Sequence, residues 1–499
     1  MKKFFCYRNK IFVISLFVLL TILFYMVPYS HDEWMWGTQE GINLLKNGFQ
    51  GYNGRYFGDL LSLIITRSVL VKALVMSTTI VILFILINKY LLSHFRKFNK
   101  TLACFIVLFL LFSLSPIMIK QTYGWPAAFV NFVPPTLFII LFIDICTKKF
   151  KKEIQLSRIK EIICGICISL GMQFFSENIT LYSLIVGVTS FIIFSISSRK
   201  LDLFSLTFSI VSSICTFLMF SNPAYSTAAS QTHGYKEITL TFDVLIEKLY
   251  SELIPYIFYE NKIVSLIVPT LIIIFILKDF SMYSQKYSIK KILNIFVLII
   301  SSIYLIFTLL FYPNLTLSVT YNDLIISSFG FLFAFALICF TIINFDSWKR
   351  NSLLLIILSI PLVSFSLVAA NPIGARSFYP VYIFWILMIL FIIGEIFCNS
   401  SISTTTIQSY CIATGILVAS VLLFYFSIYG YTFKATLQRN NIIEESVLMN
   451  AKEINLPKLP NDTYYWQTDT KNPTWLKRFK KFYHIPDNIE VKFYKNEQN

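Results

Sequence analysis

Two adjacent carboxylates follow the first apolar stretch of this 499-residue chain. Asp32 and Glu33 stand between His31 and Trp34, just after an apolar run at 11–28. A carboxylate at such a boundary can take a proton from a hydroxyl group, which is the task of a general base. Only 26 residues of the chain are acidic. Two neighbouring acids at this position therefore indicate an acidic catalytic centre.

The pair also has a purely structural interpretation. Ser30 and Glu33 have the spacing of a capping box, and Asp32 suits the positive end of a helix. Capping does not require His31 and Asp32 together, so we assign the general base to Asp32 and place His31 among the substrate-binding residues. We expect partial burial near lipid to raise the pKa of Asp32. Glu33 either serves the helix start, assists catalysis or, with Asp32, holds a divalent cation such as Mg or Mn.

Further candidate substrate-binding residues lie in segments between apolar runs. Arg55 and Asp59 are four positions apart, so they either pair on a helix or leave Arg55 to bind a phosphate or sugar. Glu177 lies between two apolar runs, where an acidic side chain is energetically costly. It is therefore either a functional residue or an acid whose side chain extends to the outer surface of the membrane. Lys120 and Arg376 suit a phosphate group, but each also fits a simple interfacial position.

One histidine completes the candidate set. His233 lies in the segment 221–261, which is long enough to cover a site. It either contacts substrate or is an ordinary loop residue.

The elements that must position these residues are apolar runs along almost the whole chain. Apolar residues make up 56% of the sequence, charged residues only 14%, and the mean hydropathy is +0.68. Runs of about 18 residues can cross a bilayer core of about 30 Å, and in lipid they must be helical. We therefore predict an all-α polytopic membrane protein with about thirteen transmembrane helices, near 11–28, 72–92, 101–119, 133–147, 161–176, 179–197, 202–220, 262–278, 292–312, 323–344, 352–370, 379–398 and 409–429.

The distribution of Lys and Arg gives the predicted orientation. With the N-terminus inside, the predicted inner segments hold 22 of these residues before the C-terminal tail, and the predicted outer segments hold 9. This asymmetry predicts a cytoplasmic N-terminus and an extracytoplasmic C-terminus. It also accounts for much of the net charge of +16, so we expect membrane lipid and no nucleic acid as a partner. None of the nine cysteines falls in a predicted outer segment, which argues against a disulfide framework.

The expected organisation has two parts. Residues 1–430 form the transmembrane domain, in which 29–71 is the first outer loop, and 431–499 form a small extracytoplasmic α+β piece. The first loop contains six of the sixteen glycines. It predicts a short helix over 31–46 that stops at Gly48 and an amphipathic helix over about 56–70.

These features together resemble a known class of membrane enzymes. The motifs are His-Asp-Glu-Trp at 31–34, Gly-Tyr-Asn-Gly-Arg-Tyr-Phe-Gly-Asp at 51–59, Ser-Glu-Asn at 176–178 and Leu-Pro-Lys-Leu-Pro at 456–460. With many spans, an early outer acid pair and an outer C-terminal piece, the chain resembles the GT-C class of glycosyltransferases. It is most similar to an uncharacterised bacterial multispanning family related to glucosyltransferases.

The resemblance implies an inverting transfer of sugar from a polyprenyl-phosphate-linked donor to a cell-surface glycan, outside a bacterial plasma membrane. The first-loop acid that acts as base or holds a metal corresponds to Asp32, and an arginine that meets the donor phosphate corresponds to Arg376. Two alternatives stay open. A transporter or flippase of lipid-linked glycan would carry charges at mid-membrane, and a polysaccharide polymerase or ligase would share the same outer residues.

Overall fold

The protein is a bundle of helices with a small mixed element at one end. The computed structural model describes residues 2–153, 157–229, 241–280, 289–312, 319–370, 372–400, 402–467 and 472–494. The main helices are α1 (Lys2–Tyr25), α5 (Val69–His94), α6 (Lys100–Phe112), α7 (Pro116–Gln121), α8 (Pro126–Phe132), α9 (Pro135–Phe150), α10 (Arg158–Met172), α11 (Glu177–Ser198), α12 (Leu203–Phe220), α13 (Pro223–Ala229), α14 (Phe242–Lys248), α16 (Lys262–Phe280), α17 (Ile289–Ile306), α18 (Val319–Asn344), α19 (Ser347–Phe365), α20 (Tyr379–Cys398) and α21 (Thr404–Leu448).

The helices confirm a multi-pass membrane protein at a coarser level than the sequence predicted. In the described part of the chain, nine helices are long and apolar enough to cross a membrane, and a bent pair at Phe242–Phe258 and Lys262–Lys278 is a possible tenth. All thirteen predicted runs overlap helices, but some of these are short, as with the 13 residues of α6. The predicted count of thirteen is therefore not confirmed.

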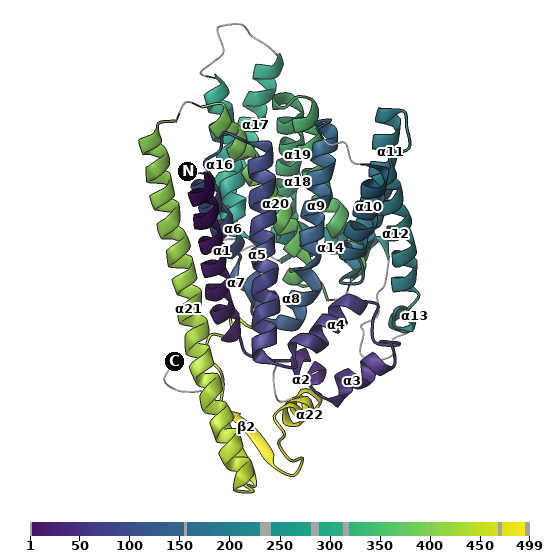
Figure 1. The fold of residues 1–499 in the computed structure, drawn as a ribbon, viewed down its shortest axis with the longest axis vertical. Coiled ribbons are helices and arrows are strands. Elements are labelled where there is room, and N and C mark those ends of the chain that lie inside the picture. Colours follow the sequence, from purple (N-terminus) through teal and green to yellow (C-terminus); the bar gives the residue numbers. More distant parts are fainter. Residues whose placement is uncertain are drawn as a thin grey trace.

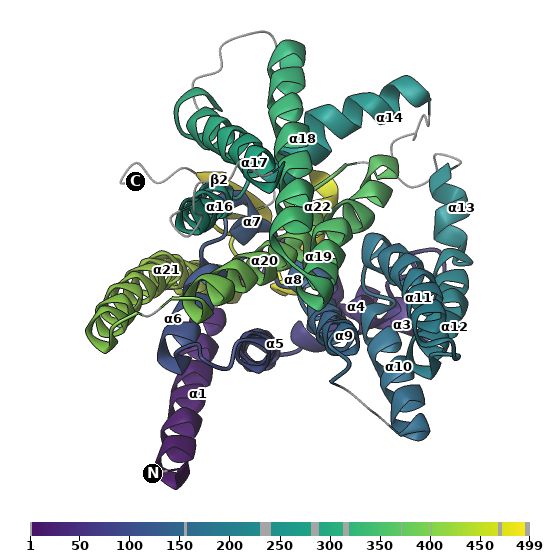
Figure 2. The ribbon, with the colours of Figure 1, turned by 90° about the horizontal axis from the view of Figure 1, so that it is seen from above.

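Helix α20 lies at the centre of the bundle. Sixteen of its twenty residues are buried, including Tyr379, Trp385 and Glu395. In the view from above, α5, α9, α16 and α19 lie around it, and α21 stands at the edge of the molecule (Figure 2). The burial of α20 therefore comes from neighbouring helices and not from lipid, and α20 forms the central helix of the bundle.

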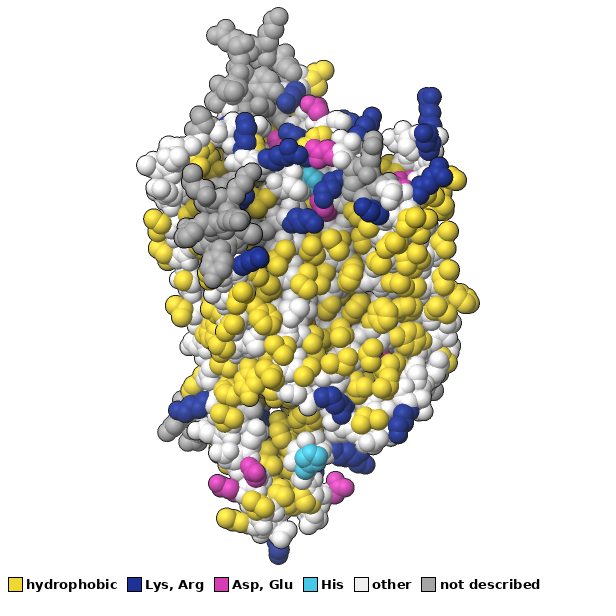
Figure 3. Space-filling model, viewed as in Figure 1, with side chains coloured by type: hydrophobic (Ala, Val, Ile, Leu, Met, Phe, Trp, Pro, Cys, Tyr) yellow, Lys and Arg dark blue, Asp and Glu magenta, His cyan; other side chains and the backbone are white. Residues whose placement is uncertain are grey.

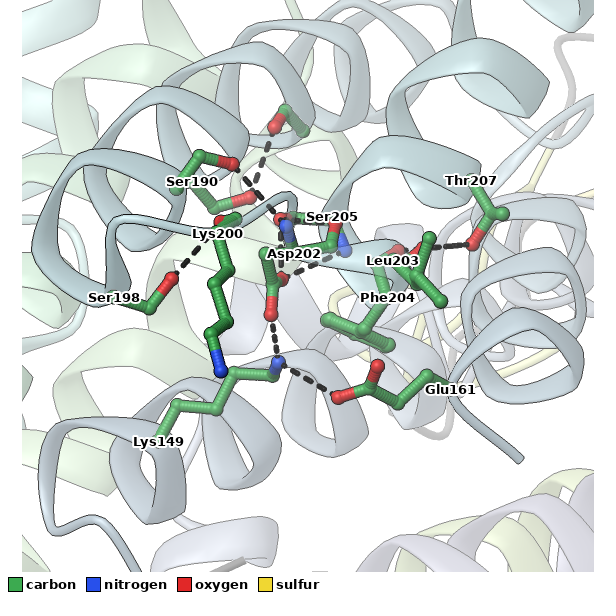
Figure 4. A network of polar contacts seen from close by, with 12 residues as sticks. Lys149, Glu161, Ser190, Ser198, Lys200, Asp202, Leu203, Phe204, Ser205 and Thr207 are labelled. Atoms are coloured by element: carbon green, nitrogen blue, oxygen red, sulfur yellow. Dashed lines mark hydrogen bonds and ion pairs between the residues drawn. The ribbon is translucent and has the colours of Figure 1, made fainter. Parts of the chain in front are cut away.

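Three helices, α10 to α12, form a group to one side of this axis (Figure 2). Lys149, at the end of α9, holds the group by ion pairs with Asp202 and with Glu161, whose carboxylate lies 3.5 Å from the Lys149 ammonium (Figure 4). Asp202 also caps α12, because its carboxylate accepts the N–H of Ser205 at 3.1 Å. One lysine thus connects three helices at the end of the bundle opposite the first loop.

The first loop folds into short helices at the lower end of the bundle in Figure 1. They are α2 (Asp32–Trp36), α3 (Gln39–Lys46) and α4 (Tyr56–Ile65). The predicted stop at Gly48 is confirmed, since this glycine has a φ of +59°. The single helix predicted over 31–46 is wrong, because the chain breaks at Gly37, where Phe482 occupies the space that a Cβ would need. The second predicted helix ends at Ile65 rather than near position 70.

A β-α-β element near the C-terminus packs against this loop. It consists of β1 (Glu453–Pro457), α22 (Pro473–Phe482) and β2 (Glu490–Tyr494), with the two strands parallel and Glu453 opposite Glu490. Its core includes Ile454, Leu456 and Phe479. Trp34 of α2 belongs to the same core, and its ring centroid lies 5.1 Å from that of Phe479. The last part of the chain is therefore built onto the first loop.

The surface agrees with a bundle that crosses a bilayer. Hydrophobic side chains form a broad belt around the middle, with Lys and Arg gathered above it and a smaller number below (Figure 3). The 45 residues of α21 have a length of about 68 Å, roughly twice the thickness of a hydrocarbon core. The far end of α21 therefore extends past the belt and carries the C-terminal element.

Candidate functional site

His31 and Asp32 form a hydrogen-bonded pair at the start of α2. The Nδ1 atom of His31 lies 2.9 Å from Oδ1 of Asp32, and the two side chains keep 19% and 28% of their surface exposed. His31 has a φ of +49°, an uncommon value for a residue with a Cβ. This backbone conformation places the two side chains next to each other at the surface. Asp32 thus keeps one carboxylate oxygen available beside an oriented imidazole.

Three tryptophans surround His31. The ring of Trp475 lies against it with centroids 3.7 Å apart, and Trp125 and Trp466 approach edge-on at 5.4 and 6.0 Å. Trp125 and Trp466 stack on each other, with centroids 4.6 Å apart and planes at 11°. We call these three residues the tryptophan wall. Trp125 is buried, whereas Trp466 and Trp475 are partly exposed, so the exposed parts of these two rings are suited to contact with the flat face of a ligand such as a sugar ring.

The tryptophan wall depends on close contact between the segment before α8 and the C-terminal tail. The N–H of Trp466 donates to the carbonyl of Gly124 at 3.2 Å. A Cβ on Gly124 would come within 2.1 Å of the carbonyl oxygen of Tyr464. Only glycine allows the tail to lie this close. The tail is thereby held where Trp466 meets Trp125.

Glu33 lies behind this surface and is completely buried. Its Oε2 accepts the N–H of Ser30 at 3.0 Å, and its Oε1 accepts the N–H of Ala127 at 2.6 Å. Burial raises the pKa of Glu33 to about 8, and the nearby charge of Asp32 adds to the effect of burial while these hydrogen bonds oppose it. The predicted contact with Ser30 N–H is confirmed. The other half of the capping box is not formed, because the Ser30 hydroxyl has no hydrogen-bond partner among the described residues.

Arg55 and Glu177 are joined by a bidentate ion pair. The Nε and Nη2 atoms of Arg55 donate to the two carboxylate oxygens of Glu177 at distances of 2.8 to 3.1 Å. The hydroxyl of Tyr225 donates to the same carboxylate at 2.8 Å. The alternative in which Arg55 pairs with Asp59 is wrong, because the structure gives Arg55 a partner on a different helix. The pair connects the first loop to the beginning of α11.

Asp59 is enclosed instead of facing the open surface. Only 2% of its surface is exposed, and its Oδ1 lies 3.5 Å from the amide of Asn53. Burial raises the pKa of Asp59 to about 8, against the opposing charge of Arg55. Its Oδ2 has no partner in the described part of the chain. Asp59 is therefore placed to support the loop and not to touch a ligand directly.

Arg376 supplies the unpaired cation of the site. It lies in a 3₁₀ turn, Ala375–Phe378, and its guanidinium carbon is 4.9 Å from the ring centroid of Trp125. Its backbone N–H donates to Gln121 at 3.3 Å. Among the described residues, the guanidinium makes no hydrogen bond and no ion pair. Lys120 extends from α7 over Trp466 at 5.8 Å, so two cations border the tryptophan wall.

The charges of these residues act on one another. Burial, the largest influence, favours protonation of Asp32, but the hydrogen bond from His31 and the charges of His31, Arg376 and Arg478 outweigh it. The pKa of Asp32 is consequently lowered, and the expectation that burial would raise it is wrong. Asp32 is ionised at neutral pH and lies within the electrostatic reach of Arg376. The structure thus brings together Asp32, His31 and Arg376, with the Arg55–Glu177 pair close behind them.

A divalent metal fits this arrangement poorly. No group of three or more His, Cys, Asp or Glu side chains suited to a metal occurs in the ranges that the structure describes. Both oxygens of Glu33 already accept backbone N–H groups, so Asp32 and Glu33 are not arranged as a ready-made pair of metal ligands. His233 lies outside the described residues. A requirement for Mg or Mn stays a prediction from resemblance.

Several residues of the site have no clear signal in the sequence. The tryptophan wall, Tyr225 and Arg478 come from segments that are far apart, and each is ordinary where it stands in the chain. The one usable signal is that all three residues of the wall, out of only seven tryptophans in the chain, lie in predicted outer segments. No family model, no characterised protein and no solved structure matches this chain.

Proposed function

We propose that this protein is a membrane glycosyltransferase. It moves a sugar from a polyprenyl-phosphate-linked donor to a cell-surface glycan on the face of the membrane that carries Asp32. The observation that supports this most directly is the unpaired guanidinium of Arg376, which lies within electrostatic reach of the ionised carboxylate of Asp32. Transfer from a sugar phosphate needs a cation for the departing phosphate and an acceptor for the proton of the incoming hydroxyl.

The reaction follows from these two groups. The acceptor hydroxyl attacks the anomeric carbon of the donor and gives its proton to Asp32, while His31 holds the carboxylate in place. The bond between the anomeric carbon and the phosphate oxygen breaks, and its electron pair leaves with the phosphate. Attack opposite the leaving group inverts the anomeric configuration. Because Asp32 has a low pKa, it is a weak base, and stabilisation of the phosphate by Arg376 carries much of the catalysis.

The other predicted residues have supporting roles in this proposal. Lys120 adds positive charge for the lipid-linked phosphate, and the tryptophan wall receives the sugar rings. The Arg55–Glu177 pair fixes the first loop against α11. The positive-inside pattern supports an orientation in which this face lies outside the membrane, with the N-terminus in the cytoplasm and the C-terminus outside. The bacterial plasma membrane is part of the proposal through the resemblance described above.

The test compares surface glycans of cells that carry the wild-type protein, Asp32→Asn or no copy. We expect Asp32→Asn, at normal membrane abundance, to give the same glycan as the deletion. Asp487→Asn removes an exposed acid from the C-terminal element outside the site, and it should behave as wild type. An unchanged glycan in the Asp32→Asn strain would show that Asp32 is not the base.

A further inference from the structure

A second cluster of cations surrounds a cavity at the opposite end of the bundle. The cavity has a volume of about 320 Å³ and lies where the loop after α5, the end of α9, the start of α19 and the end of α20 meet. A neighbouring hollow of about 350 Å³ shares Trp348, Lys349 and Glu395 with it. We call the first cavity, with its lining, the basic pocket. It has no residue in common with the site around Asp32.

The basic pocket carries excess positive charge. Arg96, Lys97, Lys151 and Lys349 line it, whereas Glu395 is its only acidic lining residue. Glu395 is already paired with Lys349 at 2.8 Å. Arg96 and Lys97 are exposed and make no ion pair within the described ranges.

The nearby acids do not neutralise this charge. Lys151 lies 3.8 Å from Glu153, which is outside the lining. Asp144, below the pocket, is engaged by His94 at 3.1 Å and by Lys148 at 2.5 Å. Burial lowers the pKa of Lys151, and the like charges of Arg96 and Lys349 lower it further. The negative charge of Glu153 acts in the opposite direction but does not outweigh them. An anion in the pocket would relieve this repulsion.

The shape of the pocket favours a ligand with one flat or apolar side. Trp348 forms a plate, with the ammonium of Lys151 4.1 Å from its ring centroid. His94 and Phe95 add two further rings to the lining. Cations and aromatic rings thus meet at the upper edge of the hydrophobic belt, where Lys and Arg gather (Figure 3).

We propose that the basic pocket binds the phosphate of an anionic membrane-lipid headgroup. The positive-inside rule explains why Lys and Arg are frequent on this side of the membrane. It does not explain why cations from three separate segments surround one cavity. Basic pockets between helices on the cytoplasmic side are suited to anionic headgroups, since the phosphate meets the cations while the acyl chains stay in the belt. The proposal is independent of the function proposed for the Asp32 face.

The experiment titrates the purified full chain in detergent with phosphatidylglycerol and follows the melting temperature. Each cation near the membrane surface contributes roughly fivefold to binding. We therefore expect Arg96→Gln with Lys151→Gln to weaken phosphatidylglycerol binding by roughly 25-fold. The matched control is Lys160→Gln with Lys200→Gln, which removes the same charge from exposed positions at the same end but outside the pocket. It should bind as the wild type does.

Two further titrations identify the source of the phosphate. Phosphatidylcholine should raise the melting temperature equally in all variants, and inorganic phosphate should have little effect at millimolar concentration. If inorganic phosphate stabilises the wild type as well as phosphatidylglycerol does, the pocket takes a free phosphate and the lipid assignment is wrong. If the control variant loses as much affinity as the pocket variant, the binding reflects general surface charge and the proposal is overturned.

Discussion

Trp125 and Trp466 stack face to face, with ring centroids 4.6 Å apart, although they belong to opposite parts of the chain. This stack holds the C-terminal tail on the segment before α8 and contributes two of the three rings that lie around His31. The first loop supplies His31 and Asp32, and the tail supplies Trp466 and Trp475.

Gly124→Ala should displace the tail. The added Cβ would meet the carbonyl oxygen of Tyr464, a backbone atom that moves only with the tail itself. We expect the free energy of unfolding to fall by about 1–3 kcal/mol and cleavage by protease between 450 and 470 to become faster. Gly415→Ala is the control, since its nearest neighbour beyond the helix is 3.5 Å away. Alanine is favoured over glycine inside a helix, so this variant should not lower the free energy of unfolding, and it should leave the rate of cleavage unchanged. Equal protection of the tail in both variants would mean that the close contact at Gly124 is not needed.

The Arg55–Glu177 pair should show a measurable coupling energy. A double-mutant cycle with Arg55→Gln and Glu177→Gln isolates this energy from the effects of each single change. The pair is bidentate and about 30% exposed, so we expect about 1–2 kcal/mol in chemical denaturation. The pair of Glu40 and Lys481, with side chains 39% and 42% exposed, should give less than about 0.5 kcal/mol. Similar couplings for both pairs would contradict a special role for Arg55 and Glu177.

Asp59 should make stability depend on pH. Burial raises its pKa from 3.8 to about 8, so between these values the folded protein binds a proton that the unfolded chain has lost. Stability must then fall as pH rises through this range and level off above pH 8. Asp59→Asn stays neutral, so its melting temperature should fall less than that of the wild type from pH 5 to pH 9. At pH 9 its free energy of unfolding should exceed that of the wild type by on the order of 1–3 kcal/mol.

Glu33 titrates over the same range, so the Asp59→Asn profile keeps a residual slope. The comparison with wild type therefore rests on the difference between the two profiles. Parallel profiles for wild type and Asp59→Asn would show that the carboxyl group is not buried as described.

Arg376→Ala should slow transfer strongly with little loss of stability. The guanidinium makes no ion pair with any described residue, and its main contact is with the ring of Trp125, so its removal leaves no unpaired buried charge behind. We expect transfer to slow by about 100-fold or more, as for the loss of one group that stabilises developing charge. Arg376→Lys keeps a point charge without the planar fork, so it should recover only part of the rate. A destabilised Arg376→Ala protein, or one with full surface glycan, would contradict this role.

The sequence predicts the bundle better than it predicts the site. Apolar runs locate the helices because a span must be apolar along its whole length, and Gly48 ends α3 as its flexibility suggests. The partner of Arg55 was not predictable in this way, because Asp59 is near in sequence while Glu177 is brought close only by the fold. Burial alone predicts the wrong direction for the pKa of Asp32, because it leaves out the hydrogen bond and charge of His31 and the charges of Arg376 and Arg478. The two arginines come from distant segments, so their effect cannot be read from the sequence around Asp32.

The contact between Trp466 and Trp125 also imposes an order on biosynthesis. Asp32 and His31 emerge from the ribosome with the first helix, but the tail that encloses them is made last, after every span has been inserted. Until then the charged face is open on one side. A chain that stops before residue 464 would contain every candidate membrane-spanning helix of the described residues and still lack Trp466 and Trp475. The surface around His31 therefore forms only in chains that extend beyond these two residues.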